Sequence, residues 1–253
     1  RGIGILVMGL TGAGKSTFIS QITQQNIEIG HSLESCTSTV YGYRYFHTNG
    51  QEIWLIDTPG FDDTNKANVQ ILGDIATFLS IFCSEHRLII GGMFYIHRIT
   101  DVRMSNSSIK SLRIFEALCG SACFKDVTII TTMWDLLQTP DALQAAERRE
   151  AALKSRDNFL GRLITGGAQY ARHKDARSSS IEVIESVVNQ QRKVVLALQE
   201  ELQRDSATTL VDTTVGKYLE GDLRDMRKKY ETKIAQLEAY NDTLVDNDDD
   251  MRA

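Results

Sequence analysis

The alternation of apolar and polar positions predicts strands and helices in turn from residue 2 to about residue 175. Short runs that are apolar throughout are typical of strands buried on both faces, whereas apolar residues three and four positions apart mark one face of a helix. Strands are predicted at residues 2–9, 40–46, 53–57, 88–96, 127–132 and 167–171, and helices at 16–24, 69–82, 109–118 and 141–163. This order predicts an α/β fold with a mostly parallel sheet covered by helices on both sides.

One strand pair in this sheet is predicted to be antiparallel. Asn49-Gly50 lies between the strands at 40–46 and 53–57, and Asn-Gly is a strong signal for a hairpin turn. The remaining strands are joined through helices and should be parallel. Ligands of such sheets bind beyond the carboxyl ends of the strands, so a functional site is expected at that edge.

The pattern changes from Ser178 onward, where no further strand is predicted and neither of the two prolines of the chain occurs. Apolar residues recur there at three- and four-residue steps, first at Val183, Val187, Val194, Leu198 and Leu202, and then at Leu219, Leu223, Met226, Tyr230 and Leu237. Helices packed on the preceding domain and a short self-associating coiled coil both explain this spacing. We therefore predict one domain over residues 1–177 and a helical extension over 178–253.

Composition narrows the class of protein. The chain has 253 residues, 42% of them hydrophobic, with 28 Lys+Arg against 33 Asp+Glu and a net charge of −5. These values exclude disordered, collagen-like and disulfide-scaffold proteins, and the mild acidity gives no support for a nucleic-acid partner. The four cysteines are expected to be reduced and mostly buried. No apolar run is long enough to span a membrane, membrane association is not supported by this segment, and a cytoplasmic location is expected.

A glycine-rich loop follows the first predicted strand. Residues 9–17, GLTGAGKST, match G-x-x-x-x-G-K-[ST] between a strand and a helix. Backbone N–H groups of such a loop converge on phosphate oxygens at the positive end of the helix. Lys15 would span the β- and γ-phosphates, and Ser16 offers a hydroxyl to Mg²⁺. The predicted phosphate-binding residues are Thr11, Gly12, Ala13, Gly14, Lys15, Ser16 and Thr17.

Two further segments complete a nucleotide site in this interpretation. Asp57-Thr58-Pro59-Gly60 follows a predicted strand, which places Asp57 where it can organise Mg²⁺ and gives Gly60 a backbone N–H for a γ-phosphate. A plain β-turn is the alternative. In the polar stretch 32–40, Thr37 is the first candidate for a hydroxyl on Mg²⁺ and Thr39 the second, with a solvated loop as the alternative.

In this order and spacing, these motifs resemble GTPases of the translation-factor-related class, in the neighbourhood of septins, immunity-associated GTPases (GIMAP type) and chloroplast-import Toc receptors. The stretches GHSLESCTS, LIDTPGFDDTN, YIHRITDVRM and VTIITTMWD are most similar to fungal proteins described as G-domain-containing. The resemblance covers roughly residues 2–172, the length of one domain. It implies a P-loop G domain that binds GTP or GDP together with Mg²⁺.

The resemblance also implies a base-reading motif, with one departure. GTPases of this kind read guanine with N-K-x-D, where this chain has TMWD at residues 132–135. Asp135 can accept the two N–H donors of the guanine edge, while Thr132 and Met133 replace Asn and Lys, as in Thr-x-x-Asp forms of GIMAP and Toc proteins. Asp135 could instead cap the next helix. Arg172 and His173 are candidates for a second base contact, with a charged surface loop as the alternative.

Hydrolysis by the glutamine route is not expected. Ras-like enzymes place glutamine directly after the DxxG glycine to orient water, and this chain has Phe61 there, which cannot hydrogen-bond. Related GTPases with an apolar residue at this position often organise hydrolysis by dimerisation across the nucleotide face. Arg98 is the first candidate for a charge-neutralising arginine and Arg103 the second. A local salt bridge between Arg98 and Asp101 that caps the next helix is the competing interpretation.

The sequence therefore favours a guanine-nucleotide switch with slow GTP hydrolysis in a nucleotide-dependent homodimer. Hydrolysis is assigned to Lys15, Thr37, Gly60, Arg98 and Arg103, and Mg²⁺ binding to Ser16, Thr37 and Asp57. A nucleotide-binding assembly module with negligible turnover is the main alternative. An ATPase is a third, because the base motif is altered. The pattern does not indicate the effector.

Overall fold

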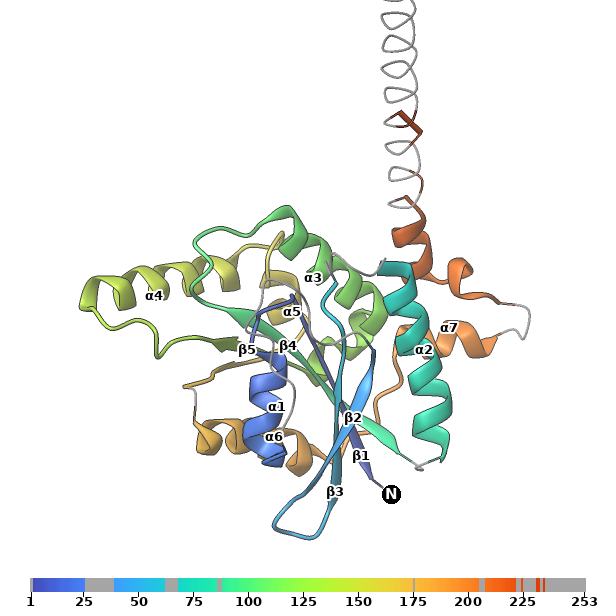
Figure 1. Ribbon diagram of the computed structural model, residues 1–253, viewed down its shortest axis with the longest axis horizontal. Coiled ribbons are helices and arrows are strands. Elements are labelled where there is room, and N and C mark those ends of the chain that lie inside the picture. The colour runs from blue at the N-terminus through green and yellow to red at the C-terminus, as the bar shows by residue number, and fades with distance from the viewer. Residues whose placement is uncertain are drawn as a thin grey trace, which may run out of the picture.

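The computed structural model describes residues 2–25, 39–61, 68–85, 88–174, 176–204 and 208–221, together with 224, 231, 232 and 234. The strands are β1 (Ile3–Gly9), β2 (Tyr41–Phe46), β3 (Glu52–Asp57), β4 (Ile89–Arg98), β5 (Val127–Thr132) and β6 (Gln169–Arg172). The α-helices are α1 (Lys15–Thr23), α2 (Asn68–Glu85), α3 (Asn106–Cys119), α4 (Pro140–Ser155), α5 (Gly161–Thr165), α6 (Arg177–Gln190) and α7 (Ala197–Arg204), with 3₁₀ helices η1 (Ser121–Asp126) and η2 (Leu210–Asp212). Strands and helices alternate as the sequence pattern predicts (Figure 1).

The six strands form one sheet in the order β2-β3-β1-β4-β5-β6. All neighbouring pairs are parallel except β2 and β3, which confirms the predicted α/β class. The β2–β3 turn is the predicted one: Gly50 has φ 83°, a left-handed conformation that favours glycine, and the Gln51 N–H donates to Asn49 Oδ1 at 2.9 Å. The parallel strands therefore end together at one edge.

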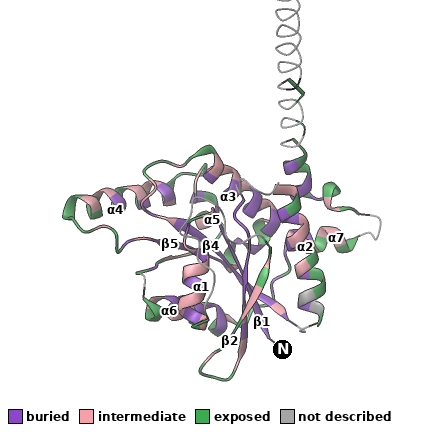
Figure 2. Cartoon of the chain, in the orientation of Figure 1, coloured by how far each residue is buried: buried purple, intermediate pink, exposed green. Residues whose placement is uncertain are grey.

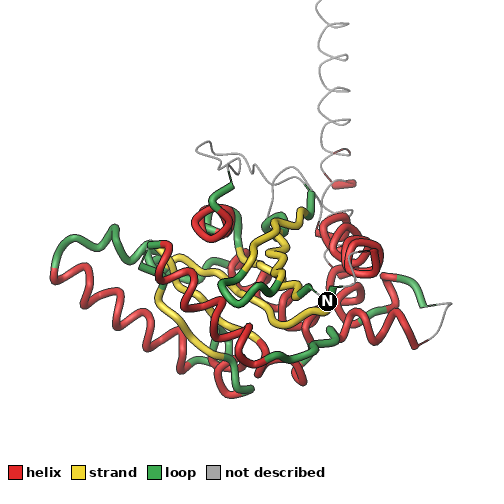
Figure 3. The backbone as a smooth tube through the Cα atoms, turned by 90° about the horizontal axis from the view of Figure 1, so that it is seen from below, coloured by secondary structure: helices red, strands yellow, loops and turns green. Residues whose placement is uncertain are grey.

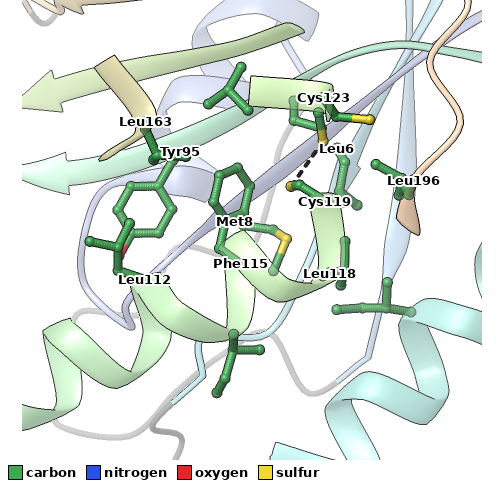
Figure 4. Packing of buried hydrophobic residues seen from close by; sticks show 14 of the residues in the cluster. Leu6, Met8, Tyr95, Leu112, Phe115, Leu118, Cys119, Cys123, Leu163 and Leu196 are labelled. Atoms are coloured by element: carbon green, nitrogen blue, oxygen red, sulfur yellow. Dashed lines mark hydrogen bonds between the residues drawn. The ribbon is translucent and has the colours of Figure 1, made fainter. Parts of the chain in front are cut away.

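Helices cover both faces of the sheet, so the core has two layers (Figure 3). On one face, α1 and α6 pack against β1, β3 and β4, with Phe18 and Ile184 both fully buried. On the other face, α2, α3 and α5 enclose the larger cluster. Tyr95 of β4 and Phe115 of α3 meet there with ring centroids 5.0 Å apart (Figure 4). Figure 2 shows the buried strands between the two layers.

The cysteines of the described chain are reduced and buried, as expected. Cys83, Cys119 and Cys123 are free, and the Cys119 thiol donates to Met93 Sδ at 3.1 Å within the larger cluster. Burial raises the pKa of Cys83 to about 11 and that of Cys119 well above its ordinary value. Thiols in this state are weak nucleophiles. Cys36 lies outside the described residues.

The predicted helix at 141–163 is wrong in one respect, because the structure divides it into α4 and α5. After Ser155 the chain turns: the Phe159 and Gly161 N–H groups both donate to the Arg156 carbonyl, at 2.9 and 3.0 Å. Gly161 belongs to this turn for a steric reason, since a Cβ there would lie 2.7 Å from the Arg156 carbonyl carbon and oxygen. α4 itself projects from the body of the molecule (Figure 1).

The segment after residue 177 packs onto the sheet domain as far as it is described. α6 contributes Val183 and Val187 to the same buried cluster as β1, and Val194 pairs with Ile90 of β4 through an N–H to carbonyl bond of 2.7 Å. α7 packs on α3. The domain boundary at 177/178 stays a prediction, and the second apolar stripe lies largely outside the described residues. Within the described part of the chain, no helix is both long and apolar enough to cross a bilayer.

We predict that α6 is needed for stability of the sheet domain. Ile184→Ala should lower the free energy of unfolding by ~2–5 kcal/mol, because it leaves a cavity at a fully buried position. Ile181→Ala, one turn earlier and only half-buried, is the matched control and should cost roughly 1 kcal/mol. Urea denaturation of both variants measures the difference. If Ile184→Ala lowers the free energy of unfolding no more than the control does, α6 is not an integral part of the core.

Candidate functional site

The loop between β1 and α1 has the backbone that phosphate binding requires. Gly12 and Gly14 have φ of 75° and 94°, which L residues with side chains rarely adopt. Gly14 is the N-cap of α1 and gives it no side-chain hydrogen bond, and the first turn of α1 carries no acidic residue. The N–H groups at the positive end of α1 are thus not satisfied by a capping side chain, which favours an anion there.

Lys15 lies at the centre of this loop. Its side chain is buried, with 6% exposed, and its Nζ donates to the carbonyls of Gly9 and Leu10 at 3.1 and 3.0 Å. These two carbonyls hold the ammonium group against the loop that they belong to. The charge therefore sits where phosphate oxygens bound by the loop would meet it.

Ser16 and Asp57 meet across the gap between α1 and β3. The register of β1 and β3 places Val7 beside Asp57, and Ser16 Oγ donates to Asp57 Oδ2 at 2.9 Å. Asp57 is 1% exposed, and its Oδ1 is buried without a hydrogen bond of normal geometry. Burial raises the pKa of Asp57, while the charge of Lys15 and the Ser16 hydrogen bond oppose that rise.

This pair fits Mg²⁺. A hydroxyl oxygen beside a carboxylate with an unsatisfied oxygen is a hard donor set, and Mg²⁺ takes one or two protein ligands with phosphate oxygens and water. Among the described residues, no group of three or more His, Cys, Asp or Glu side chains could hold a metal by itself. Phosphate oxygens and water would therefore complete the coordination. Thr37, the third predicted ligand, lies outside the described residues, and the alternative Thr39 is exposed.

The segment after β3 packs directly on the phosphate loop. Thr58 Oγ1 donates to the Val7 carbonyl at 2.9 Å, which ties the start of this segment to β1. A Cβ on Gly60 would lie 2.4 Å from both the N and Oγ1 atoms of Thr11, so only glycine permits this approach. Phe61 is 1% exposed and belongs to the larger core cluster. Its side chain is therefore packed in the core and has no group that could orient water.

Arg98, at the end of β4, lies against the phosphate loop of its own chain. Its NH1 atom is 3.4 Å from the position of a Cβ on Gly12, and its Nε is 2.5 Å from Asp101 Oδ1. The local salt bridge considered from the sequence is therefore present. It does not cap α3, whose N-cap is Ser105, with Oγ accepting the Ser108 N–H at 3.0 Å.

Arg103, the second candidate, is exposed and makes no ion pair with the described residues. It lines a pocket of about 260 Å³ beside the loop, together with Leu10, Thr11 and Arg98. Both candidate arginines thus border the phosphate end of the site.

The base-reading segment follows β5. Thr132 Oγ1 donates to the Ala13 carbonyl at 2.8 Å, so the residue in place of Asn links β5 to the phosphate loop. Met133 has φ 63°, a left-handed backbone that is uncommon outside glycine. Asp135 is exposed and does not cap α4, whose N-cap is Thr139. The helix-cap alternative for Asp135 is therefore wrong.

The two candidates after β6 have structural partners in the described chain. Arg172 makes two hydrogen bonds to Glu150, of 2.8 and 2.5 Å, and its Cζ lies 4.3 Å from the centre of the Trp134 ring. His173 is 3% exposed and its Nε2 lies 2.8 Å from Ser180 Oγ. The base contacts predicted for Arg172 and His173 stay predictions.

Glu150 was not identified from the sequence. It is the buried acid that orients Arg172 over Trp134 in the base-reading segment. The available signal is its position three residues after Glu147 on α4, which puts two acids on one helix face. The sequence pattern does not indicate that this face of α4 packs against the end of β6.

Comparison with known proteins supports the fold. Residues 4–105 match the model of a family described as 50S ribosome-binding GTPase. Three structures of Toc33 from Arabidopsis thaliana are similar: a dimerization-deficient mutant (16% identity, TM-score 0.60), the complex with Mg²⁺ and GMPPNP (17%, 0.59) and the complex with GDP and Mg²⁺ (20%, 0.55). Each covers 77% of this chain, and 87–88% of the Toc33 chain is covered. No curated protein sequence matches. The fold and phosphate loop define a P-loop G domain.

We predict that Glu150 maintains the Arg172–Trp134 stack. In a Trp54→Phe background, which leaves Trp134 as the only tryptophan, Glu150→Gln should shift Trp134 emission to the red, because the guanidinium no longer covers the indole. Glu147→Gln is the control, because this exposed acid makes a longer and weaker contact with Arg172, of 3.5 Å. Identical spectra for the two variants would contradict the assignment.

The same stack predicts a pH dependence. Burial raises the pKa of Glu150, but hydrogen bonds from Arg172 and the charges of Lys154 and Arg172 outweigh it, so the pKa lies below 4.5. A carboxyl with a lowered folded-state pKa stabilises the fold above its unfolded-state pKa, and this contribution is lost as pH falls through the folded-state value. Trp134 emission should stay constant from pH 7 to about 4.5 and change only below.

Proposed function

We propose that this chain is a guanine-nucleotide-binding switch that hydrolyses GTP to GDP and phosphate, slowly and with assistance from dimerisation. The observation that carries the proposal is the Ser16–Asp57 hydrogen bond of 2.9 Å beside the buried Lys15. A lysine, a hydroxyl and a carboxylate at one loop form the donor set for a nucleoside phosphate with Mg²⁺. The match of residues 4–105 to a GTPase family supports the same reaction.

Mg²⁺ would be held by Ser16 and Asp57, with Thr37 as the third proposed ligand. When bound, the ion bridges phosphate oxygens and neutralises the charge that develops during transfer. Lys15 and the N–H groups of residues 11–17 orient the phosphates in this proposal. Gly60 adds a backbone N–H next to Thr11, and its contact with the phosphate loop would be sensitive to the presence of a γ-phosphate.

Asp135 is proposed as the group that selects guanine over adenine. A carboxylate can accept both N–H donors on the guanine edge, whereas adenine offers no such pair. Asp135 is exposed at the end of the turn that begins with the left-handed Met133, so it is free of the helix-capping role. Trp134 beneath Arg172 gives this turn a rigid base.

The proposed route of hydrolysis uses an arginine in place of glutamine. Phe61 is buried in the core and cannot orient water. Arg98 lies beside its own Gly12 and is paired with Asp101, which suits a role within one chain. Arg103 is exposed at the same edge, which suits a role across a dimer. Dimerisation is described as important for the GTPase activity of the similar translocon components atToc33 and psToc159.

Two other functions can each be distinguished from this proposal by one measurable property, either turnover or base preference. A nucleotide-binding assembly module would bind GTP without multiple turnovers, and the buried Phe61 is the feature that favours it. An ATPase would prefer adenine, and the altered TMWD motif is the feature that favours it. A cytoplasmic location, a homodimer through the nucleotide face and a septin- or GIMAP-like role belong to the proposal as well.

The base assignment makes a sharp prediction. Asp135→Asn should weaken GTP binding by about tenfold or more, because the amide NH₂ group would face an N–H donor of guanine where the carboxylate has an acceptor oxygen. The same variant should gain affinity for xanthosine triphosphate, whose carbonyl replaces the guanine amino group and accepts from the new amide. Asp141→Asn, at an exposed position in the first turn of α4, is the control. Calorimetric titration with both nucleotides measures the exchange, and unchanged preferences in Asp135→Asn would remove Asp135 from base recognition.

The dimer-assisted route predicts a dependence on protein concentration. The rate of phosphate release per protomer should rise through the dimerisation range, and Arg103→Ala should remove most of that rise, since an arginine acting in trans is worth ~10³–10⁵ in rate. Arg204→Ala, an exposed position at the end of α7, should leave the rate unchanged. A rate per protomer that stays flat would eliminate the trans-arginine hypothesis.

A further inference from the structure

A second pocket borders the loop that carries Arg98 and Arg103. It occupies about 270 Å³ between this loop and the C-terminal half of α4. The polar side chains that line it are His97, Asp101, Arg103, Arg149 and Arg156. None of the assignments made to nucleotide, Mg²⁺ or base explains this cavity.

Three arginines give the pocket a positive charge that no carboxylate of the described chain neutralises. Arg103, Arg149 and Arg156 form no ion pair with described residues, whereas Asp101 in the same wall is already 2.5 Å from Arg98. Arg149 is held in place because its Nε donates to the Ile99 carbonyl at 3.1 Å. Its other guanidinium N–H groups make no hydrogen bond to described residues, so they remain available for an anion.

His97 supplies a buried polar group to the same cavity. It is 4% exposed, and its backbone carbonyl accepts from Thr132 Oγ1, but its imidazole makes no hydrogen bond with the described residues. Burial lowers the pKa of His97 to about 4, with Arg98 adding to the effect and Asp101 opposing it. The imidazole is therefore neutral at physiological pH, with one donor and one acceptor nitrogen. These nitrogens can hydrogen-bond a ligand in the cavity that His97 lines.

The rest of the lining is apolar. Met104, Leu153 and Phe159 contribute to the wall, and Arg156 lies over the Phe159 ring with Cζ 5.7 Å from its centre. A cavity with an apolar wall and a few convergent polar groups is the usual form of a small-molecule site. The charge and the apolar wall together specify a ligand with an anionic head and an apolar body.

We propose that this pocket binds a small organic phosphate whose ester group is aromatic or aliphatic. Arginine binds phosphate oxygens in a bidentate geometry. Three arginines carry more positive charge than a ligand with a single carboxylate would require, which favours a phosphate as the anionic head. The apolar body would pack against Met104 and Phe159. The neutral His97 would hydrogen-bond the ligand at the buried end of the cavity.

This site would also bear on hydrolysis, a consequence that rests on the proposed function. Asp101, Val102 and Arg103 line both this pocket and the pocket beside the phosphate loop. A ligand in this pocket would therefore contact residues that also line the pocket beside the phosphate loop. Binding itself does not depend on GTP turnover.

Phenyl phosphate is the probe that tests the proposal. Calorimetric titration of the full chain should show one site, weakened by about tenfold or more in Arg156→Gln and in Arg149→Gln. The Arg156 side chain makes no hydrogen bond to described residues, and the backbone carbonyl that holds the turn is unchanged by substitution, so this variant should fold even if Arg149→Gln does not. Arg148→Gln, next to Arg149 but outside the lining, is the matched control and should bind within about twofold of the parent. Equal binding by all three variants would overturn the proposal.

Methionine methyl resonances show where the probe binds. In protein labelled at the methionine methyl groups, the Met104 signal should shift on addition of phenyl phosphate, and the Met133 signal in the base-reading segment should not. Inorganic phosphate should bind more weakly, because it has no apolar body. A shift of Met133 without Met104, or equal binding of inorganic phosphate, would contradict the proposal.

Phosphate release from GTP measured with and without the probe tests the consequence for hydrolysis. A changed rate of phosphate release supports coupling between the second pocket and hydrolysis, and an unchanged rate contradicts it. Failure to hydrolyse GTP without the probe would count against the proposed function and leave the binding result standing.

Discussion

The candidate site depends on one contact, the hydrogen bond of 2.9 Å from Ser16 to Asp57. It forms because β1 and β3 are parallel and in a register that sets Val7 beside Asp57, so that the first residues of α1 and the last residue of β3 reach the same point. Thr58 strengthens this junction by donating to the Val7 carbonyl. The buried Asp57 carboxylate has one oxygen without a hydrogen bond of normal geometry, which a nearby cation would satisfy.

Other strands hold the same loop from the opposite side. β4 and β5 are in a register that places Arg98 beside Thr132. Thr132 donates to the Ala13 carbonyl, and Arg98 extends over Gly12. A displacement of the phosphate loop would therefore disturb the base-reading segment and the Arg98–Arg103 loop together. This connection between the phosphate loop, the base-reading segment and the arginine loop supports the proposal that the domain is a switch.

The sequence predicted most of the elements because buried strands and amphipathic helices have different periods, and the motif at residues 9–17 specified the phosphate loop. It failed at α4, where a continuous helical pattern conceals the turn at Arg156 that Gly161 permits. It could not indicate that Thr132 reaches Ala13 or that Glu150 orients Arg172. Those contacts join residues far apart in the chain, and their partners follow from strand register rather than from local pattern.

The central claim is that the Ser16–Asp57 pair serves Mg²⁺-dependent turnover of a guanine nucleotide. Release of phosphate under multiple-turnover conditions, with GTP or ATP and with or without Mg²⁺, tests it most directly. We expect release from GTP that requires Mg²⁺, is much faster than release from ATP and is abolished by Ser16→Ala in a folded protein. Release that is equal for the two nucleotides, or a rate unaffected by Ser16→Ala, would contradict the account.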